Sequence, residues 1–131
     1  LHSTNAATDD SDRRFKREIR TLSSVLSSLV RLEGGSYYFN QEAFPDKAFS
    51  TDKQLGVIAQ DVQKLFPELV HKGGDGYFSV SYGRFVPLFI EAIKEQQLMI
   101  LSQAKELEVL RSEVDVLRRD VDRLLEKLQE D

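Results

Sequence analysis

The stretch VPLFIEAIKEQQLMILSQAKELEVLRSEVDVLRRDVDRLLEKL, residues 86–128, decides the architecture of this chain. Within it, apolar side chains return with a seven-residue period. Heptad position a holds Val86, Ile93, Ile100, Leu107, Val114, Val121 and Leu128, and position d holds Phe89, Gln96, Gln103, Leu110, Leu117 and Leu124. Pro87 stands in the first turn, where a helix tolerates it, and no glycine follows. The pattern predicts one helix about 65 Å long, whose stripe is buried only by a partner helix, as in a coiled coil.

The charges that flank the stripe indicate which partner this is. Position g carries Glu106, Glu113 and Asp120, and position e carries Arg111 and Arg118. In a parallel coiled coil each g side chain meets the e side chain five positions later on the next chain, so acids meet arginines, whereas in an antiparallel coil like charges meet. Each exposed pair contributes only about 0.2–1 kcal/mol. The signs nevertheless favour a parallel homo-oligomer.

The number of helices in the coil stays open at this level. Val114 and Val121 at position a, with leucine at d, favour two helices. Isoleucine at a with Gln96 and Gln103 at d is less typical of dimers, and polar layers of this kind fix register and oligomeric state at a cost in stability. The alternative is a single long helix packed along a partner domain.

The residues before the long helix fit one small domain. The chain has 131 residues, of which 40% are hydrophobic and 31% charged, and this allows a small domain with an appendage. The patterns predict a helical stripe over 19–30, strands over 36–39, 55–58 and 77–82, a helix over 60–66 and a hairpin turn at 73–76. We therefore expect an α+β fold: a polar arm (1–10), a domain of short antiparallel strands and helices (11–85), and a coiled-coil helix (86–131).

Composition excludes several classes of function. There is no cysteine, and the only histidines are His2 and His71, so we expect no zinc site, no other metal and no cofactor. No apolar run approaches the 18 or so residues that span a membrane, and we expect no membrane partner. Because the chain starts at Leu1 without an initiator methionine, we expect a fragment of a longer protein, with any targeting signal upstream.

Two features imitate binding sites. The basic cluster Arg13, Arg14, Lys16, Arg17 and Arg20 has the composition of a nucleic-acid patch, but the net charge is −4 and no aromatic residues interleave for base stacking. We expect a solvated helix start there and no nucleic acid. Residues 73–76, GGDG, lack the lysine and hydroxyl of a phosphate-binding loop, so a hairpin turn is expected and no small-molecule substrate.

One constellation has catalytic potential, namely Ser11 and Lys16. A serine hydroxyl and a lysine amine form a nucleophile and base pair when the lysine gives up its proton, which burial or neighbouring positive charge favours. Arg13, Arg14 and Arg17 lie around Lys16 in the sequence. On spacing alone, a surface serine beside a surface lysine explains the pattern equally.

Four blocks in order resemble the peptidase S74 family. Residues 11–19, SDRRFKREI, are similar to its SD-x-R-x-K-x-x-I opening, and residues 37–39, YYF, to its aromatic strand. Residues 56–62, GVIAQDV, with 66–70, FPELV, resemble its GxIAQEV…FPELV signature. Residues 79–95, SVSYGRFVPLFIEAIKE, resemble the block that leads into the coil. The resemblance runs from Ser11 to about Gln97, with Asp61 and Ser81 as departures.

The resemblance implies an intramolecular chaperone and a self-cleaving serine endopeptidase. Such domains lie at the C-termini of phage tailspikes, endosialidases and neck appendages, and within myelin regulatory factors. They trimerise, assist the assembly of an upstream fibre or β-helix and then release themselves. Matching residues 11–19 to the family's opening motif implies that Ser11 is the nucleophile and Lys16 the general base, with Asp12 beside the cleaved bond. Residues 1–10 then contain the end of the upstream passenger, and the expected location is a phage tail or bacterial surface, with assembly in the host cytoplasm for a phage.

The scissile bond and the biological context stay open. Attack of Ser11 on the preceding carbonyl closes a five-membered ring, whereas attack on its own carbonyl closes a strained four-membered one. Asp10–Ser11 is therefore favoured over Ser11–Asp12, although attack on a neighbouring chain relaxes this argument. The alternative functions are a non-cleaving trimerisation or stalk module and a self-cleaving segment of a membrane-tethered transcription factor. In either case we expect monomers of low stability, with Phe85, Phe89 and Ile93 shared across the oligomer interface.

Overall fold

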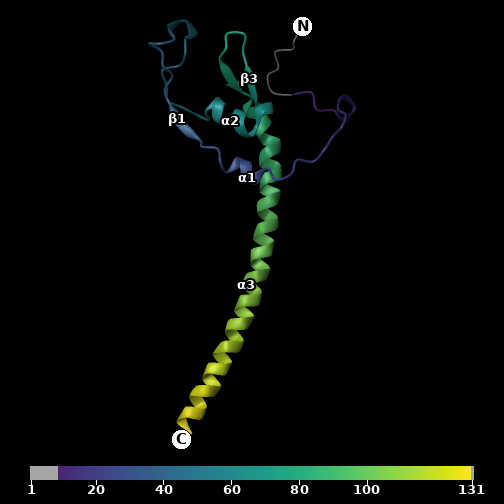
Figure 1. Cartoon of the computed structure of the whole chain (residues 1–131), viewed down its shortest axis with the longest axis vertical. Helices are drawn as coiled ribbons and strands as arrows, with labels where there is room; N and C mark the ends of the chain where they lie inside the picture. Colours follow the sequence, from purple (N-terminus) through teal and green to yellow (C-terminus); the bar gives the residue numbers. More distant parts are fainter. Residues whose placement is uncertain (1–8, 131) are drawn as a thin grey trace.

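The fold is a small head from which one long helix projects (Figure 1). This computed structural model describes residues 9–130; the rest of the expected upstream arm, residues 1–8, lies outside the described residues. The long helix, α3, spans Phe85–Gln129, 45 residues, and the head precedes it in the sequence. Short antiparallel strands followed by a long C-terminal helix confirm the predicted α+β class. The coiled coil and its number of helices stay predictions.

Two separate two-stranded antiparallel sheets form the strand part of the head. In the first, β1 (Gly35–Tyr37) pairs with β2 (Gln54–Gly56), with Ser36 opposite Leu55. In the second, β3 (Val70–Lys72) pairs with β4 (Phe78–Val80) across the expected hairpin turn. Gly76 takes a φ of 87° in this turn, which only glycine adopts without strain. The sequence thus predicted β1, β2 and β4, each slightly longer than observed or shifted by a residue, but it did not predict β3.

The helix α2 (Ala59–Leu65) lies where the sequence predicts it. It ends because Pro67 follows and begins a short 3₁₀ turn, Pro67–Leu69, that leads directly into β3. Val57, the residue after β2, contacts the 3₁₀ turn Tyr82–Arg84 that precedes α3. The hydroxyl of Tyr82 accepts a hydrogen bond from the backbone N of Val57 at 3.1 Å. A Cβ at Gly56 would lie 2.5 Å from that hydroxyl, so any larger residue there would displace the Tyr82 side chain.

The hydrophobic core is small and lies where the head meets α3. Its buried members are Val25, Val62, Leu69, Phe85 and Leu88. Val62 of α2 is fully buried, while Leu88 and the nearby Ala92 present the first turns of α3 to the head. Phe85, expected at an oligomer interface, is only 6% exposed because its own chain covers it, so that prediction is wrong for Phe85. Phe89 and Ile93 remain about half exposed or more, at 47% and 63%.

The helix predicted from residue 19 is much shorter than expected. The structure has only α1, Leu26–Leu29, so the prediction is wrong for residues 19–25. Ser24 takes a φ of 55°, a left-handed conformation that a right-handed helix cannot contain. Ile19 and Leu22 are 58% and 43% exposed, so the described residues leave much of their apolar surface uncovered. The helix ends at Leu29, before the glycines at 34–35, and Gly35 begins β1.

Candidate functional site

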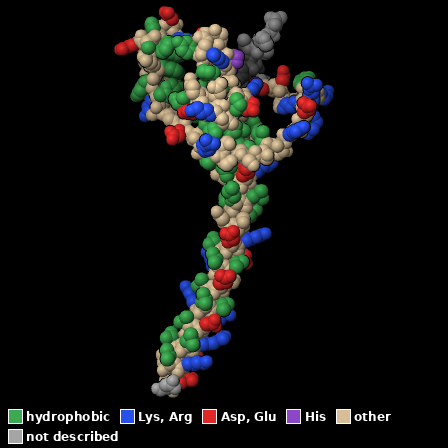
Figure 2. Space-filling model, in the orientation of Figure 1, with side chains coloured by type: hydrophobic (Ala, Val, Ile, Leu, Met, Phe, Trp, Pro, Cys, Tyr) green, Lys and Arg blue, Asp and Glu red, His purple; other side chains and the backbone are tan. Residues whose placement is uncertain are grey.

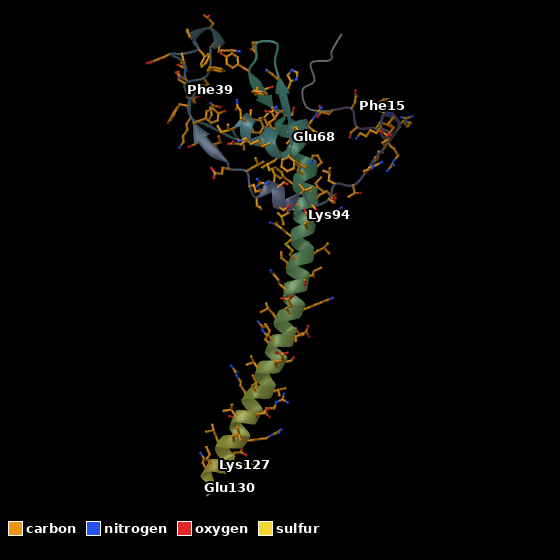
Figure 3. The ribbon with its side chains drawn as sticks, in the orientation of Figure 1. Phe15, Phe39, Glu68, Lys94, Lys127 and Glu130 are labelled. Atoms are coloured by element: carbon orange, nitrogen blue, oxygen red, sulfur yellow. The ribbon has the colours of Figure 1, made fainter. Side chains whose placement is uncertain are left out.

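The candidate site lies on an exposed arm, residues 9–24, that leaves the head beside α1. Every residue of the arm is exposed, and the arm forms an open loop on the side of the head opposite β1 before it reaches α1 (Figure 1). Its one regular element is a 3₁₀ turn, Arg13–Phe15, closed by backbone hydrogen bonds from Phe15 to Asp12 and from Lys16 to Arg13, each 3.1 Å. Phe15 is 73% exposed, and Figure 3 places it far from Phe39 on the opposite side of the head.

This turn brings the two candidate catalytic side chains together. Lys16 Nζ donates a hydrogen bond to Ser11 Oγ at 2.6 Å. The chain enters the turn extended at Asp12 and leaves it extended at Lys16, so side chains five positions apart meet across it. The spacing that the sequence singled out therefore corresponds to direct contact, within the reach that a nucleophile and its base require.

Asp12 caps the turn and clamps Arg14. One carboxylate oxygen accepts hydrogen bonds from the backbone N and from Nε of Arg14, at 2.9 and 3.0 Å, and the other accepts from Nη2 at 2.9 Å. The hydrogen bonds from the guanidinium, followed by that from the backbone N, hold the pKa of Asp12 below its usual value, against a weaker opposing effect of desolvation. The carboxylate of Asp12 raises the pKa of Arg14. A charged fork thus braces the turn that joins Ser11 to Lys16.

The other end of the arm is anchored to the long helix. The carboxylate of Glu95, which is partly buried in α3, accepts a hydrogen bond from the backbone N of Leu26 at 2.8 Å. This contact caps the first turn of α1, whose own preceding residue, Val25, supplies no side-chain cap. The C-terminal end of the arm is thus held at a fixed point on α3.

The residue types at 11–12 predict a helix or turn cap, which Asp12 provides, but they predict neither its fork with the Arg14 guanidinium nor the contact of Glu95 with Leu26. The spacing of Asp12 and Arg14, two positions apart at the start of a turn, was a usable signal, because an aspartate before a turn commonly caps it. The contact of Glu95 with Leu26 left no signal in the sequence, because it joins residues 69 positions apart.

A cavity of the head lies elsewhere. It has a volume of about 500 Å³ between the loop after β1 and the β3–β4 hairpin, and its lining includes Phe39, Phe44, Phe49 and Tyr77. An ion pair of Lys47 Nζ with Asp75 at 3.0 Å lies at this cavity. None of the candidate site residues lines it. In this single chain the Ser11–Lys16 pair is an open surface site, not one enclosed in a pocket.

The apolar stripe of α3 is uncovered below the head. From Gln96 to the end of α3 every residue is exposed, including the leucine and valine side chains of positions a and d. Figure 2 shows hydrophobic side chains following the helix downward, with lysine, arginine and acidic side chains between them. Along the described part of α3, ion pairs join Glu91 to Lys94 and Asp120 to Arg123. They do not involve the g and e residues Glu106, Glu113, Arg111 and Arg118.

The comparisons with known proteins agree with the motifs. Residues 11–71 match the family Peptidase_S74, described as chaperone of endosialidase, which confirms the resemblance over these residues; the block at 79–95 lies outside the match. The matched segment begins at Ser11. The chain is also 28% identical over 112 residues to the long tail fiber protein Gp37 of Salmonella phage S16. That alignment covers 83% of this chain but 15% of the relative, so the chain spans a small part of that protein. Within residues 9–130, no helix is both long and apolar enough to cross a membrane.

Proposed function

We propose that this chain, whose residues 11–71 carry the chaperone-of-endosialidase match, oligomerises, assists the assembly of an upstream fibre segment and then cuts itself free at Ser11. The family match and the tail fibre relative support the chaperone and assembly role and a place on a virion tail. The observation that carries self-cleavage is the 2.6 Å hydrogen bond between Lys16 and Ser11, at the first residue of the matched segment.

The proposed reaction needs one proton carrier and one water. Lys16, with its nitrogen lone pair free, takes the proton of Ser11 Oγ as that oxygen attacks the carbonyl carbon of Asp10. The same proton passes to the amide nitrogen of Ser11 as its bond to that carbon breaks, leaving an ester between Asp10 and the Ser11 side chain. Water then hydrolyses the ester, which restores the hydroxyl and leaves a carboxylate on Asp10 and a free amine on Ser11.

The exposure of the pair has two consequences for this reaction. Water reaches Ser11 and Lys16 freely, which suits the hydrolytic step. The first step forms an oxyanion, which needs hydrogen-bond donors placed for it. We propose that neighbouring copies and the passenger complete the site on assembly, so that cleavage follows folding. Cleavage after assembly then makes the product kinetically stable, because the released fibre cannot unfold along the path by which it folded.

The proposed assembly is a parallel homotrimer built on α3. Its support is the uncovered apolar stripe, together with the acidic g and basic e positions that are complementary only between parallel copies. In this proposal residues 1–10 hold the end of the passenger, residues 11–85 the chaperone and self-cleaving domain, and residues 86–131 the coiled coil.

The experiment uses the chain with its native upstream segment, as wild type, as Ser11→Ala and as Leu110→Asp/Leu117→Asp. We expect wild type to give a released, protease-resistant passenger oligomer, and Ser11→Ala to give the same oligomer still joined to the chaperone. The coil variant should give neither assembly nor release. Normal passenger assembly in the coil variant would contradict the chaperone role. An intact chain in wild type would leave a non-cleaving stalk module.

A further inference from the structure

The cavity of about 500 Å³ in the head, which we call the aromatic cavity, is lined by paired aromatic rings. Phe39 stacks on Phe49 with their ring centroids 4.2 Å apart, and Phe44 meets Tyr77 edge to face at 5.7 Å. The second pair joins the loop after β1 to the β3–β4 hairpin, so both elements contribute to the wall. Phe44 and Tyr77 are nevertheless 37% and 54% exposed, which leaves much of their ring surface uncovered.

The border of the aromatic cavity has carboxylates to spare. Residues 40–54 and 70–80, which form its two sides, carry four acidic and three basic side chains. Two of the lysines are engaged: Lys47 Nζ pairs with Asp75 at 3.0 Å, and Lys72 Nζ lies 5.8 Å from the centroid of a lining ring. Within the described residues, no ion pair engages the three exposed acidic side chains of the loop, Glu42, Asp46 and Asp52. The border therefore suits an apolar group that is accompanied by cations.

Phe15 is such a group. It is 73% exposed, more than any other aromatic side chain in the described residues. It stands in the segment RRFKR, residues 13–17, in which the other four side chains are all basic. Within residues 9–130, no other exposed large apolar side chain has a basic residue on both sides. The chemistry of Phe15 and its neighbours thus complements both the rings and the border of the aromatic cavity.

The arm that carries Phe15 is not attached to its own head. Its hydrogen bonds and its one ion pair run between residues 11 and 16. No hydrogen bond or ion pair joins residues 9–23 to the rest of the described chain. A surface that holds this arm in place must therefore come from another molecule.

The arm and the aromatic cavity lie on opposite sides of the head. Figure 3 places Phe15 and the lining residue Phe39 on opposite sides of α3, at similar levels along the long axis of the molecule. Figure 2 shows lysine and arginine side chains gathered on the arm. A parallel, in-register coil keeps the heads of all copies at one level, and in a closed ring two different surfaces of neighbouring copies meet. The arm side and the cavity side are two such surfaces.

We propose that the aromatic cavity is an inter-chain docking site, and that its occupant is Phe15 of a second copy of this chain. The inference rests on the parallel homo-oligomer of the proposed function and adds the arm to its interface. The rings of the cavity offer Phe15 edge-to-face and stacked contacts. Arg17, which makes no ion pair within residues 9–130, then meets the carboxylates of the loop. Because exposed ion pairs contribute little, the ring of Phe15 is the anchor of the contact.

This docking connects assembly to the candidate catalytic pair. Phe15 immediately precedes Lys16 and is the last residue of the 3₁₀ turn across which Lys16 reaches Ser11. An anchored Phe15 therefore holds this turn against the head of the next copy. The Ser11–Lys16 pair, open to solvent in the single chain, becomes part of an interface only in the assembled oligomer.

Cross-linking tests the contact, because the chain contains no cysteine of its own. The test protein is the full chain with Arg13→Cys, near the anchor, and Ser79→Cys, an exposed residue of the cavity lining, treated with a short bismaleimide. Two matched proteins carry the same cysteines with Phe15→Ala or with Ile19→Ala, which truncates another exposed apolar side chain of the arm. Native mass spectrometry without cross-linker first gives the oligomeric state of all three. Every substituted residue follows Ser11, so the result does not depend on self-cleavage.

We expect the test protein and its Ile19→Ala version to lose their monomer band to covalently joined chains. The Phe15→Ala version should join at least about tenfold more slowly, the loss typical of an aromatic anchor. Chains that carry only one of the two cysteines should join only when they are expressed together.

Three results would overturn the docking. An oligomer in which the test protein joins no faster than its Phe15→Ala version would remove the docking and leave the oligomer standing. Linker that bridges both cysteines within one chain would show that Phe15 lies at the cavity of its own head. A monomeric chain would overturn both the docking and the proposed assembly.

Discussion

Asp12 accepts hydrogen bonds from the guanidinium of Arg14 through both carboxylate oxygens. This fork closes the turn across which Lys16 reaches Ser11. The fork touches neither reacting atom, so it acts by positioning. Nothing else among the described residues braces the turn except its two backbone hydrogen bonds.

Removing the fork should slow cleavage without removing the dyad. We expect Asp12→Ala and Arg14→Ala each to lower the rate by about tenfold to a hundredfold, the scale of loss that a misplaced reacting group causes. Arg13→Ala is the control, because within the described part of the chain its side chain makes no ion pair. Time courses of fragment appearance give the rates. Equal losses in Arg13→Ala and Arg14→Ala would show that charge on the arm matters, and not the fork.

The fork should be visible in a pH titration. Hydrogen bonds from Arg14 place the pKa of Asp12 below the ordinary value of 3.8. A depressed pKa in the folded state means that the fork is complete above the unfolded value and is lost as the pH falls through the lowered one. We expect NMR of the side-chain carboxyl carbons to give Asp12 a midpoint below 3.8, rising toward 3.8 in Arg14→Ala. An ordinary midpoint in both proteins would show that the fork is not formed.

Glu95 should stabilise the head through its cap on α1. Glu95→Ala leaves the backbone N of Leu26 without its partner at a partly buried position, which we expect to lower the free energy of unfolding by about 1–3 kcal/mol. Glu95→Gln keeps an acceptor oxygen and should lose less. Urea unfolding measures both. Equal stability of the alanine variant and wild type would mean that solvent caps α1 just as well.

The charges along α3 predict the direction of the coil. In a parallel assembly, Glu106→Lys with Glu113→Lys places lysines opposite Arg111 and Arg118. We therefore expect a lower Tm, because each lost ion pair contributes about 0.2–1 kcal/mol to the stability of the coil. No charged residue lies three or four positions from either glutamate, so the helix itself is little affected. Glu126→Lys, at an outward position, is the control. An unchanged Tm would indicate an antiparallel coil, in which lysine facing lysine only replaces glutamate facing glutamate.

The sequence predicted best those elements that local pattern determines. The heptad stripe predicted α3, and Pro67 predicted the end of α2. The glycine-rich turn predicted the hairpin, where the Asp75 side chain accepts a hydrogen bond from the backbone N of Tyr77 at 3.0 Å. Each of these features depends on residues close together in the chain.

The misses have a common physical cause. The spacing of Ile19, Leu22 and the later apolar residues predicts a helix over 19–30, but an amphipathic pattern forms a helix only where a surface covers its apolar face. Ile19 and Leu22 remain 58% and 43% exposed in the part of the chain that the structure describes. Phe85 is expected at the oligomer interface, yet the head of its own chain covers it. Of the candidate site, the spacing of Ser11 and Lys16 was predictable, and the anchor at Glu95 was not.

Intact mass under denaturing conditions tests the central claim most directly. The sample is freshly purified chain with a longer native N-terminal segment, as wild type, as Ser11→Ala and as Ser23→Ala, an exposed serine on the same arm. The account predicts that wild type and Ser23→Ala split into two fragments between Asp10 and Ser11, and that Ser11→Ala stays whole. One intact chain in all three, or a split Ser11→Ala chain, would contradict self-cleavage by Ser11.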